Sequence, residues 1–439
     1  MGAGPAGATA ARVLARAGVR VRLLDRAAFP RNKPCGGGIS IRALTRFPDL
    51  APELPRIATH TVSRLYLEGP DGHAATIESD SPAALMIRRV EFDALLVSMA
   101  KTAGAEIVSG ADVVQASAAD DGVTLMTRDG RRFEAPVVIA ADGVHSIVAR
   151  RVGLNPGWAA SAVALDMMEE TPRDTLRDLD PSTLWVAYGY EPKTGTGEDA
   201  ENAEKKDLSA VSARSAVRRG HEGYAYIFPK RDHVNIGIGY VLSHYRESVD
   251  AAPYELQRSF VARLRERGIV EGESVRDNFT PFLIPVGGPL QEVGRGRVLL
   301  AGDAGGFVNG FTAEGIYYAM VTGELAARAV VDSGRDIAGL ARRYARACDY
   351  EIGMELRDSV AIQRFLFADR RRIAHVIDGA HRETVTTRLI LEFAAGRRSY
   401  NDLRRRLLTR FPLLAGRLAW DWLIRLVRKN SVVQRRPAF

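Results

Sequence analysis

The first seven residues of the chain constrain its fold more than any other segment. Gly2-Ala3-Gly4-Pro5-Ala6-Gly7 reads G-x-G-x-x-G, and the Ala-rich residues 8–17 predict a helix closed by Gly18. Glycines in such a turn let the backbone approach a diphosphate, and the helix N-terminus offers it unpaired N–H groups. Residues 19–24 then read as a strand that ends at Asp25, near the offset of about 20 residues at which a carboxylate binds a ribose hydroxyl. This order predicts a dinucleotide-binding unit.

The start of this unit departs from the expected pattern. The fingerprint should follow a strand, and only Met1 precedes Gly2. That strand is central in a sheet of this type, so we expect the first strand to lie upstream of Gly2 and the written start to be late.

Two later segments repeat the strand-then-turn pattern. Residues 136–141 predict a short buried strand that runs into Asp142-Gly143, and residues 297–301 predict another that runs into Gly302-Asp303. An amphipathic helix is expected from Ile316 onward. Each segment alone is also compatible with an ordinary strand-to-loop turn.

Composition narrows the classes of partner. The net charge of +8 and the pI near 9.6 suit an anionic partner, such as a cofactor phosphate, a diphosphate substrate or an acidic membrane face. The sequence contains no nucleic-acid recognition motif, so we expect no nucleic-acid partner.

Cys35 and Cys348 form no CxxC pair, which argues against a disulfide framework or a metal site. With no apolar run long enough to span a membrane and no signal-peptide layout, we expect a cytoplasmic protein.

The three segments in this order resemble the FAD-binding domain of the para-hydroxybenzoate hydroxylase type. The resemblance extends to residues 88–93, where Arg89 matches an arginine placed near the cofactor. It implies that the helix starting at Gly315 points its N–H groups at the flavin pyrimidine, where negative charge collects on reduction. The cofactor-binding residues expected on this basis are Gly2, Gly4, Ala6, Gly7, Asp25, Gly36, Gly38, Arg89, Val113, Asp142, Gly143, Asp303, Gly315 and Ile316.

Two further stretches are similar to those of the geranylgeranyl reductase family. Residues 33–38 read KPCGGG, and residues 224–229 read YAYIFP, where the family carries PCGG and Y-x-W-x-FP. The similarity runs from Gly2 to about Leu340. Three positions depart from the family pattern: Tyr226 replaces a tryptophan, Gly310 a proline and Ala313 a glycine.

The family resemblance implies an enzyme that reduces isolated double bonds of a prenyl chain, with NADPH or ferredoxin as external reductant. The substrate would be a prenyl lipid, quinone or diphosphate. Cys35 is the candidate catalytic residue, as proton source or as a shaper of the flavin face, although most free cysteines are merely small buried residues. The expected substrate-binding residues are Tyr224, Tyr226, Phe228 and Pro229. An FAD-dependent monooxygenase, a halogenase or a non-catalytic flavin-binding protein stays as an alternative.

The predicted fold class is α/β, with a Rossmann-like FAD-binding domain, an antiparallel-sheet substrate domain and a C-terminal helical region. The FAD-binding domain is expected at residues 1–60, 85–160 and 290–335, and the sheet domain at 61–84 and 161–289 with an insertion at 191–220. The basic region 336–439 ends in Trp- and Leu-containing stretches beside Arg and Lys, which either pack on the body or contact the inner membrane face peripherally.

Overall fold

The fingerprint folds into the turn and helix that its sequence predicts. The computed structural model describes residues 1–190, 223–334, 337–380, 384–394 and 397–409. Helix α1 (Pro5–Arg16) follows Gly4, with a proline in its first turn, where the absent N–H costs nothing. It packs against α9 (Ile316–Ser333) and α3 (Arg89–Thr102). A Cβ added to Gly323 of α9 would lie 2.1 Å from the carbonyl oxygen of Ala6, so the two helices cross with almost no space between their backbones.

Short parallel strands surround the fingerprint. Strand β1 (Arg22–Leu24) pairs with β7 (Glu106–Val108), and β11 (Val138–Ala140) pairs with β18 (Val298–Leu300). Met1 and Gly2 connect the two pairs, because Gly2 N donates to Leu24 O at 2.7 Å and Ala141 N donates to Met1 O at 2.7 Å. The phosphate-binding turn therefore leaves the sheet between β1 and β11, as in a dinucleotide-binding fold. The expectation of an upstream strand stays a prediction.

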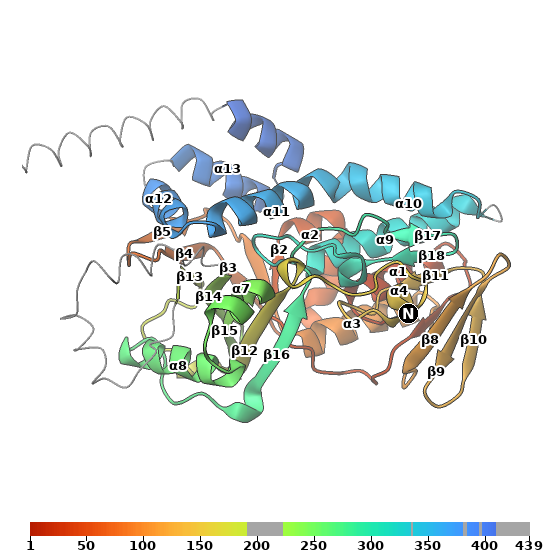
Figure 1. Cartoon of the computed structure of the whole chain (residues 1–439), viewed down its shortest axis with the longest axis horizontal. Helices are drawn as coiled ribbons and strands as arrows, with labels where there is room; N and C mark the ends of the chain where they lie inside the picture. Colours follow the sequence, from red (N-terminus) through yellow and green to blue (C-terminus); the bar gives the residue numbers. More distant parts are fainter. Residues whose placement is uncertain (191–222, 335–336, 381–383, 395–396, 410–439) are drawn as a thin grey trace, which may run out of the picture.

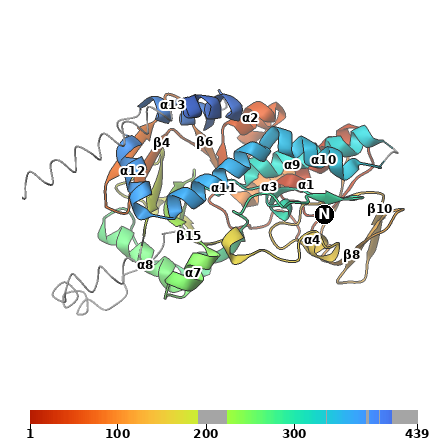
Figure 2. The same cartoon turned by 45° about the horizontal axis from the view of Figure 1, so that its top comes forward.

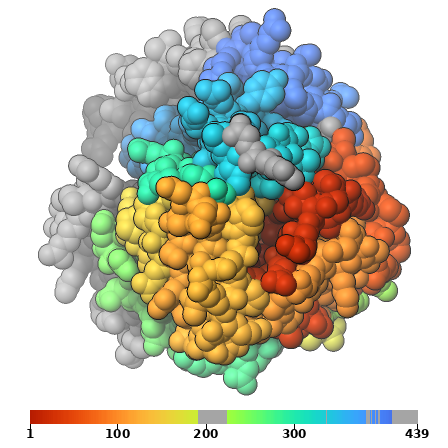
Figure 3. All heavy atoms as spheres, turned by 90° about the vertical axis from the view of Figure 1, so that its right-hand side faces the viewer, coloured from red at the N-terminus to blue at the C-terminus, as the bar shows by residue number. Residues whose placement is uncertain are grey.

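Two small antiparallel sheets flank this unit. One is ordered β10-β9-β8, from β8 (Val113–Ala118), β9 (Val123–Thr127) and β10 (Arg132–Ala135), and stands at the right of Figure 1. Figure 3 shows its gold surface facing the red N-terminal residues across a hollow. The other joins β2 (Gly38–Ser40), β6 (Ala84–Ile87) and β3 (Thr59–Val62) in the order β2-β6-β3. Strand β17 (Gly294–Arg295) pairs antiparallel with β18.

The second part of the molecule is a seven-stranded sheet ordered β16-β12-β15-β14-β13-β4-β5. Its strands are β4 (Arg64–Glu68), β5 (Ala74–Glu78), β12 (Ala164–Pro172), β13 (Thr183–Tyr188), β14 (Gly223–Pro229), β15 (His233–Val241) and β16 (Phe279–Ile284). Adjacent strands pair antiparallel except β13 with β4. The fold class predicted from the sequence is confirmed.

The two faces of this sheet bury different surfaces. The outer face packs on α8 (Pro253–Glu266) through a cluster that includes Trp185, Ile236 and Phe260. The inner face carries Leu65, Leu67, Met168, Val186, Tyr188, Tyr224, Tyr226, Phe228 and Phe282. These side chains share one face because alternate residues of a strand point the same way.

Helices complete the fold at the C-terminal end. Helix α10 (Leu340–Cys348) continues through a π-helical turn, Asp349–Gly353, into α11 (Met354–Phe367), and this rod crosses above α9 (Figures 1 and 2). Helices α12 (Arg370–Ala380) and α13 (Thr384–Ala394) follow. Among the described residues, no helix is both long and apolar enough to cross a membrane. The predicted insertion at 191–220 and the Trp-containing stretch of the C-terminal region lie outside the described residues.

Smaller helices fill the connections. They are α2 (Arg42–Arg46), α4 (Ile147–Arg151) and α7 (Leu242–Ser248), with 3-10 helices at Pro48–Arg56, Ala160–Ala162, Arg173–Thr175, Arg276–Asn278 and Gly302–Gly305.

Candidate functional site

The three glycines of the fingerprint differ in what surrounds them. Gly2 has φ +89, and a Cβ there would lie 2.3 Å from Ala141 O; at Gly7 it would lie 1.8 Å from Gly2 O. These two positions require glycine because backbone passes directly against them. At Gly4 the nearest atoms are guanidinium nitrogens of Arg31 and Arg89, both 3.9 Å away. Gly4 therefore borders open space beside two cations.

This open space fits an anionic diphosphate. Helix α1 has no side-chain cap at its N-terminus, which leaves its first N–H groups available to a ligand. Arg89 donates to both carboxylate oxygens of Asp93, at 2.7 and 2.8 Å, and Arg31 Nη1 lies 3.2 Å from the same carboxylate. Burial opposes the charge of Arg89, but Asp93 outweighs it and raises its pKa. Both cations are thus held fixed beside the helix start, where FAD would place its pyrophosphate.

Asp25 holds the backbone of the turn. Its carboxylate accepts the N–H of Ala3 at 2.7 Å and that of Ala27 at 2.9 Å, and the residue is 8% exposed. The sequence predicts only a ribose contact for this residue. The fixed carboxylate also orders the fingerprint itself.

The two later segments end in buried acids. Asp142 accepts from Ser146 Oγ at 2.6 Å and from Ile147 N at 2.8 Å, which orders the start of α4, and Gly143 next to it has φ +81. Burial raises the pKa of Asp142. Val113, in β8, is buried in the core cluster beneath this region, so that its side chain faces other apolar residues.

The GD segment lies at the start of α9. Burial raises the pKa of Asp303, while Lys33 and Arg89 act in the opposite direction, which places that carboxyl near both cations. A Cβ on Gly315 would lie 3.4 Å from Asp303 Oδ1, and α9 begins at the next residue, Ile316, as predicted. The structure thus brings the fingerprint side and the GD side together around Arg89.

The loop before α9 contains two of the sequence departures, and the structure gives a reason for one of them. Gly310 N donates to Ser359 Oγ of α11 at 2.8 Å, and proline would lack this donor. Ala313 has φ +56, the only positive φ of a non-glycine residue in the described part of the chain. Glycine adopts this conformation without strain.

The KPCGGG segment packs against the inner face of the sheet. A Cβ on Gly36 would lie 2.7 Å from the ring of Phe228, and Gly37 has φ +76 against Ile87 O. Cys35 O accepts from Lys230 Nζ at 3.4 Å. The Cys35 thiol accepts from Gly37 N at 3.4 Å and lies within hydrogen-bonding reach of Arg89. Cys35 therefore lies at the junction between the cation pair and the sheet.

The four predicted substrate-binding residues divide between the two faces of the sheet. Tyr224, Tyr226 and Phe228 line the inner face. Pro229 points to the outer face, as Ala225 and Ile227 do. Tyr224 donates to Thr312 O at 2.8 Å, so the aromatic strand reaches the loop before α9.

Sequence reasoning missed Arg31, Lys33 and Asp166. Asp166, in β12, accepts the hydroxyl of Tyr226 at 3.0 Å and is 5% exposed. Arg31 and Lys33 sit in a short loop whose contacts come from residues distant in sequence, so only the count of basic residues near KPCGGG could have drawn attention to them.

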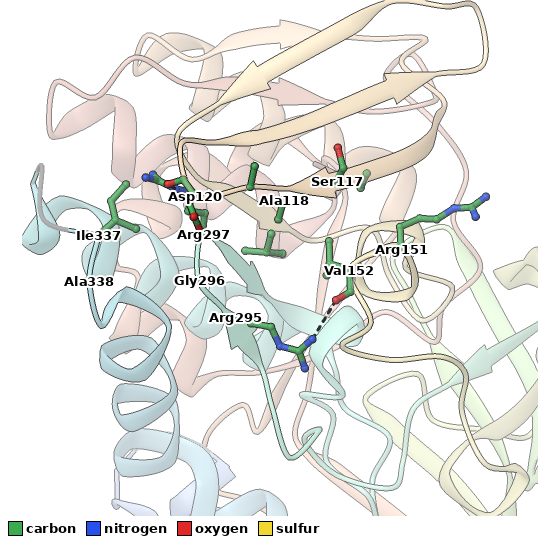
Figure 4. A pocket seen from close by; sticks show the side chains of 13 residues that line it. Ser117, Ala118, Asp120, Arg151, Val152, Arg295, Gly296, Arg297, Ile337 and Ala338 are labelled. Atoms are coloured by element: carbon green, nitrogen blue, oxygen red, sulfur yellow. Dashed lines mark hydrogen bonds between the residues drawn. The ribbon is translucent and has the colours of Figure 1, made fainter.

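A surface pocket of about 720 Å³ lies away from these residues, between β8 and β17. Figure 4 shows Arg151, Arg295 and Arg297 around it. Arg295 donates to Val152 O at 3.3 Å, and Arg297 donates to Asp120 O at 2.7 Å, so both arginines bind backbone.

Comparison with known proteins agrees with this geometry. Residues 1–230 match the model of the FAD binding domain family. Menaquinone reductase of Mycobacterium tuberculosis is 31% identical over 383 residues, covering 83% of this chain and 84% of that protein. The chain belongs to the family of FAD-dependent oxidoreductases that includes the menaquinone and geranylgeranyl reductases.

Two further proteins are similar to this chain over most of their length. Digeranylgeranylglycerophospholipid reductase 2 of Methanothermobacter thermautotrophicus is 27% identical over 371 residues, covering 82% of this chain and 85% of that protein. The crystal structure of a geranylgeranyl bacteriochlorophyll reductase-like protein from Thermoplasma acidophilum superposes with a TM-score of 0.71 at 17% identity, covering 93% of this chain and 97% of that one. The chain described here is therefore an FAD-dependent oxidoreductase.

Proposed function

We propose that this enzyme hydrogenates isolated double bonds in the prenyl chain of a lipid, quinone or diphosphate. The observation that carries the proposal is the inner face, an apolar and aromatic surface placed directly against the KPCGGG segment and the loop before α9. A prenyl chain has no polar group to bind, so its site must be recognised by shape and apolar contact. The names of two relatives, menaquinone reductase and digeranylgeranylglycerophospholipid reductase 2, support the same class of substrate.

In this mechanism the chain's own residues bind, orient and exclude water. Arg31, Arg89 and the start of α1 hold the diphosphate of the cofactor, and Asp25 keeps the fingerprint turn in shape. Bound FAD, once reduced by NADPH or ferredoxin, supplies a hydride. Phe228 and Tyr226 exclude water from the alkene, which matters because a cation-like transition state would otherwise be captured by it. Cys35 shapes the flavin-facing wall.

The test uses purified protein with bound FAD, reduced anaerobically with dithionite and offered geranylgeranyl diphosphate, whose double bonds are its only groups that a hydride could reduce. Mass spectrometry should show the gain of one hydrogen molecule per reduced bond. The Cys35→Ser variant should alter turnover or the number of bonds reduced. Product carrying an added oxygen, formed only in air, would instead identify a monooxygenase.

A lipid substrate also implies peripheral membrane contact, which we propose for the C-terminal helices at the inner membrane face. Ile362 and Phe365 of α11 and Val376 of α12 are 46%, 59% and 53% exposed, and arginines at 370–372 lie nearby. Flotation with anionic vesicles measures this contact, and protein that stays at the bottom of the gradient would contradict it.

A further inference from the structure

Two carboxylates project from β12 onto the inner face of the sheet, and their surroundings differ. Glu170 accepts from Lys230 Nζ at 2.5 Å and from Arg88 Nε at 2.7 Å, so its charge is matched. Asp166 lies four residues earlier on the same face and forms no ion pair with the described residues. A buried acid with no cationic partner has little structural reason to be retained, because an apolar residue would cost less there.

The neighbouring strand makes room for this acid. A Cβ on Gly239 of β15 would lie 3.4 Å from Asp166 Oδ1, and a Cβ on Gly237 would lie 2.4 Å from the Tyr226 hydroxyl. The two glycines let the Tyr226 ring lie flat across the sheet with its hydroxyl on Asp166. Tryptophan, which the family carries in place of Tyr226, has no oxygen to offer at this point. The acid and the tyrosine thus form a matched pair in this chain.

The pair lies where the sheet meets the flavin-binding segments. Phe282 is the partner of Asp166 on β16, and Lys33 Nζ lies 4.5 Å from the centre of its ring. Gly36 contacts the rings of Phe228 and Tyr226. Burial raises the pKa of Asp166 to about 7, while the Tyr226 hydroxyl and Lys33 act in the opposite direction. The group can therefore hold or release a proton near neutral pH.

We propose that Asp166 is the acid that protonates the prenyl double bond, with Tyr226 orienting its carboxyl group; this role rests on the proposed function. The π bond breaks, one carbon accepts the hydride of reduced FAD, and the other forms a C–H bond with the proton of Asp166. The O–H bond of Asp166 breaks, and the resulting carboxylate lies beside the cation-like carbon and stabilises it. The cofactor loses two electrons and the alkene gains them, and Asp166 takes up a proton from water before the next turnover.

The kinetic test compares two acids of the same strand. Asp166→Asn removes the proton donor on the inner face, and Glu169→Gln makes the matched change on the outer face, where Glu169 is 1% exposed. With the FAD-loaded enzymes reduced anaerobically, the flavin of Asp166→Asn should be reoxidised about 10²- to 10⁴-fold more slowly than that of wild type when geranylgeranyl diphosphate is added. Glu169→Gln should stay close to wild type, and FAD affinity, measured by flavin fluorescence, should be unchanged in both.

The second readout needs no substrate. An infrared titration of the wild-type holoenzyme should show a protonated-carboxyl C=O stretch that disappears with a midpoint near neutral pH. Asp166→Asn should abolish that transition. Tyr226→Phe should move the midpoint of this transition to higher pH. The Tyr226 hydroxyl stabilises the ionised carboxylate in the wild type, so removing it raises the pKa of Asp166.

The outcomes separate the two proposals. An active wild-type enzyme with an equally active Asp166→Asn variant overturns the role of Asp166 and leaves prenyl reduction in place. A wild-type enzyme that reduces no prenyl compound, with the infrared transition intact, overturns the proposed function and this role with it. A transition that persists in Asp166→Asn overturns the assignment of the acid.

Discussion

The two faces of the seven-stranded sheet are built from the same strands, yet they bury side chains for different purposes. On the outer face Trp185 packs against Phe260 of α8, with ring centroids 6.2 Å apart. The inner face places Tyr226 and Phe228 against the glycine-rich backbone at Gly36, and Tyr224 near the start of α12 and the end of α11. The inner face therefore meets backbone of the flavin-binding segments, which the outer face does not.

Each face also buries one acid from β12. Glu169 on the outer face accepts from Ser274 Oγ at 2.7 Å and from Val275 N at 3.2 Å, which fixes the chain that leads into β16. Asp166 on the inner face instead accepts a hydrogen bond from a side chain, the hydroxyl of Tyr226 at 3.0 Å. Both acids are buried, but Glu169 fixes a neighbouring segment of the chain whereas Asp166 is held by one tyrosine. Their hydrogen-bond partners therefore distinguish a structural acid from a candidate functional one.

The largest expected effect comes from truncating matched aromatics. Phe260→Ala, in the helix that covers the outer face, should lower the free energy of unfolding by about 3–5 kcal/mol. Phe260 is fully buried, so its truncation leaves a cavity. Phe228→Ala on the inner face should cost less stability, since its ring is only half-buried, but should weaken prenyl binding. Denaturant unfolding and substrate titration measure the two quantities. Equal stability losses would remove the distinction between the faces.

The second effect concerns pH. The folded-state pKa of Asp166, about 7, exceeds its unfolded value near 3.8, so the folded protein holds this proton more tightly. Its contribution is complete below about pH 4 and falls by about 1.4 kcal/mol for each pH unit up to about 7. The stability of Asp166→Asn relative to wild type should therefore rise across this range in thermal unfolding.

Glu169→Gln provides the control for that measurement. Burial raises the pKa of Glu169 as well, but Ser274 and Val275 oppose the rise, so its variant should show a shallower dependence on pH. Parallel stability curves for wild type and Asp166→Asn would contradict the assignment of the raised pKa.

The smallest effect lies in the loop that completes the inner face. Ala313→Gly should stabilise the protein by up to about 1 kcal/mol, because Ala313 has φ +56 and glycine adopts this conformation freely. Part of the gain is offset by the greater freedom of glycine in the unfolded chain. Thermal unfolding measures the change, and destabilisation would show that the Ala313 methyl group contributes packing that exceeds the strain.

The dinucleotide-binding part could be predicted from sequence because its signals are local. The turn of Gly2–Gly7, the helix after it and the strand before Asp25 are specified within a single stretch, and α1 and β1 form as expected. The strands before Asp142-Gly143 and Gly302-Asp303 are equally local, and β11 and β18 confirm them. The helix expected from Ile316 is α9.

The residues that the sequence did not reveal depend on long-range pairing. Asp166 lies in a run that reads ALDMMEE, in which nothing marks one acid as different from the next. Only the register of β12 with β15, and of β15 with β14, places it beside Gly239 and Tyr226. Arg31 is revealed only when α3 brings Asp93 to it. Pro229 lies on the opposite face from Phe228 because successive residues of a strand point to opposite faces. The sequence prediction assigns the whole YAYIFP motif to one surface.

The rod formed by α10 and α11 contacts both halves of the molecule, the cofactor-binding strands and the seven-stranded sheet. At one end Tyr344 donates to Leu300 O at 2.6 Å, beside the cofactor-binding strands, and at the other Phe367 packs with Ala75 and the edge of the aromatic sheet. Between them Ser359 fastens the loop at Gly310. The rod therefore restricts hinge motion between the two halves, so that access of any ligand to the inner face depends on local movement of loops and side chains.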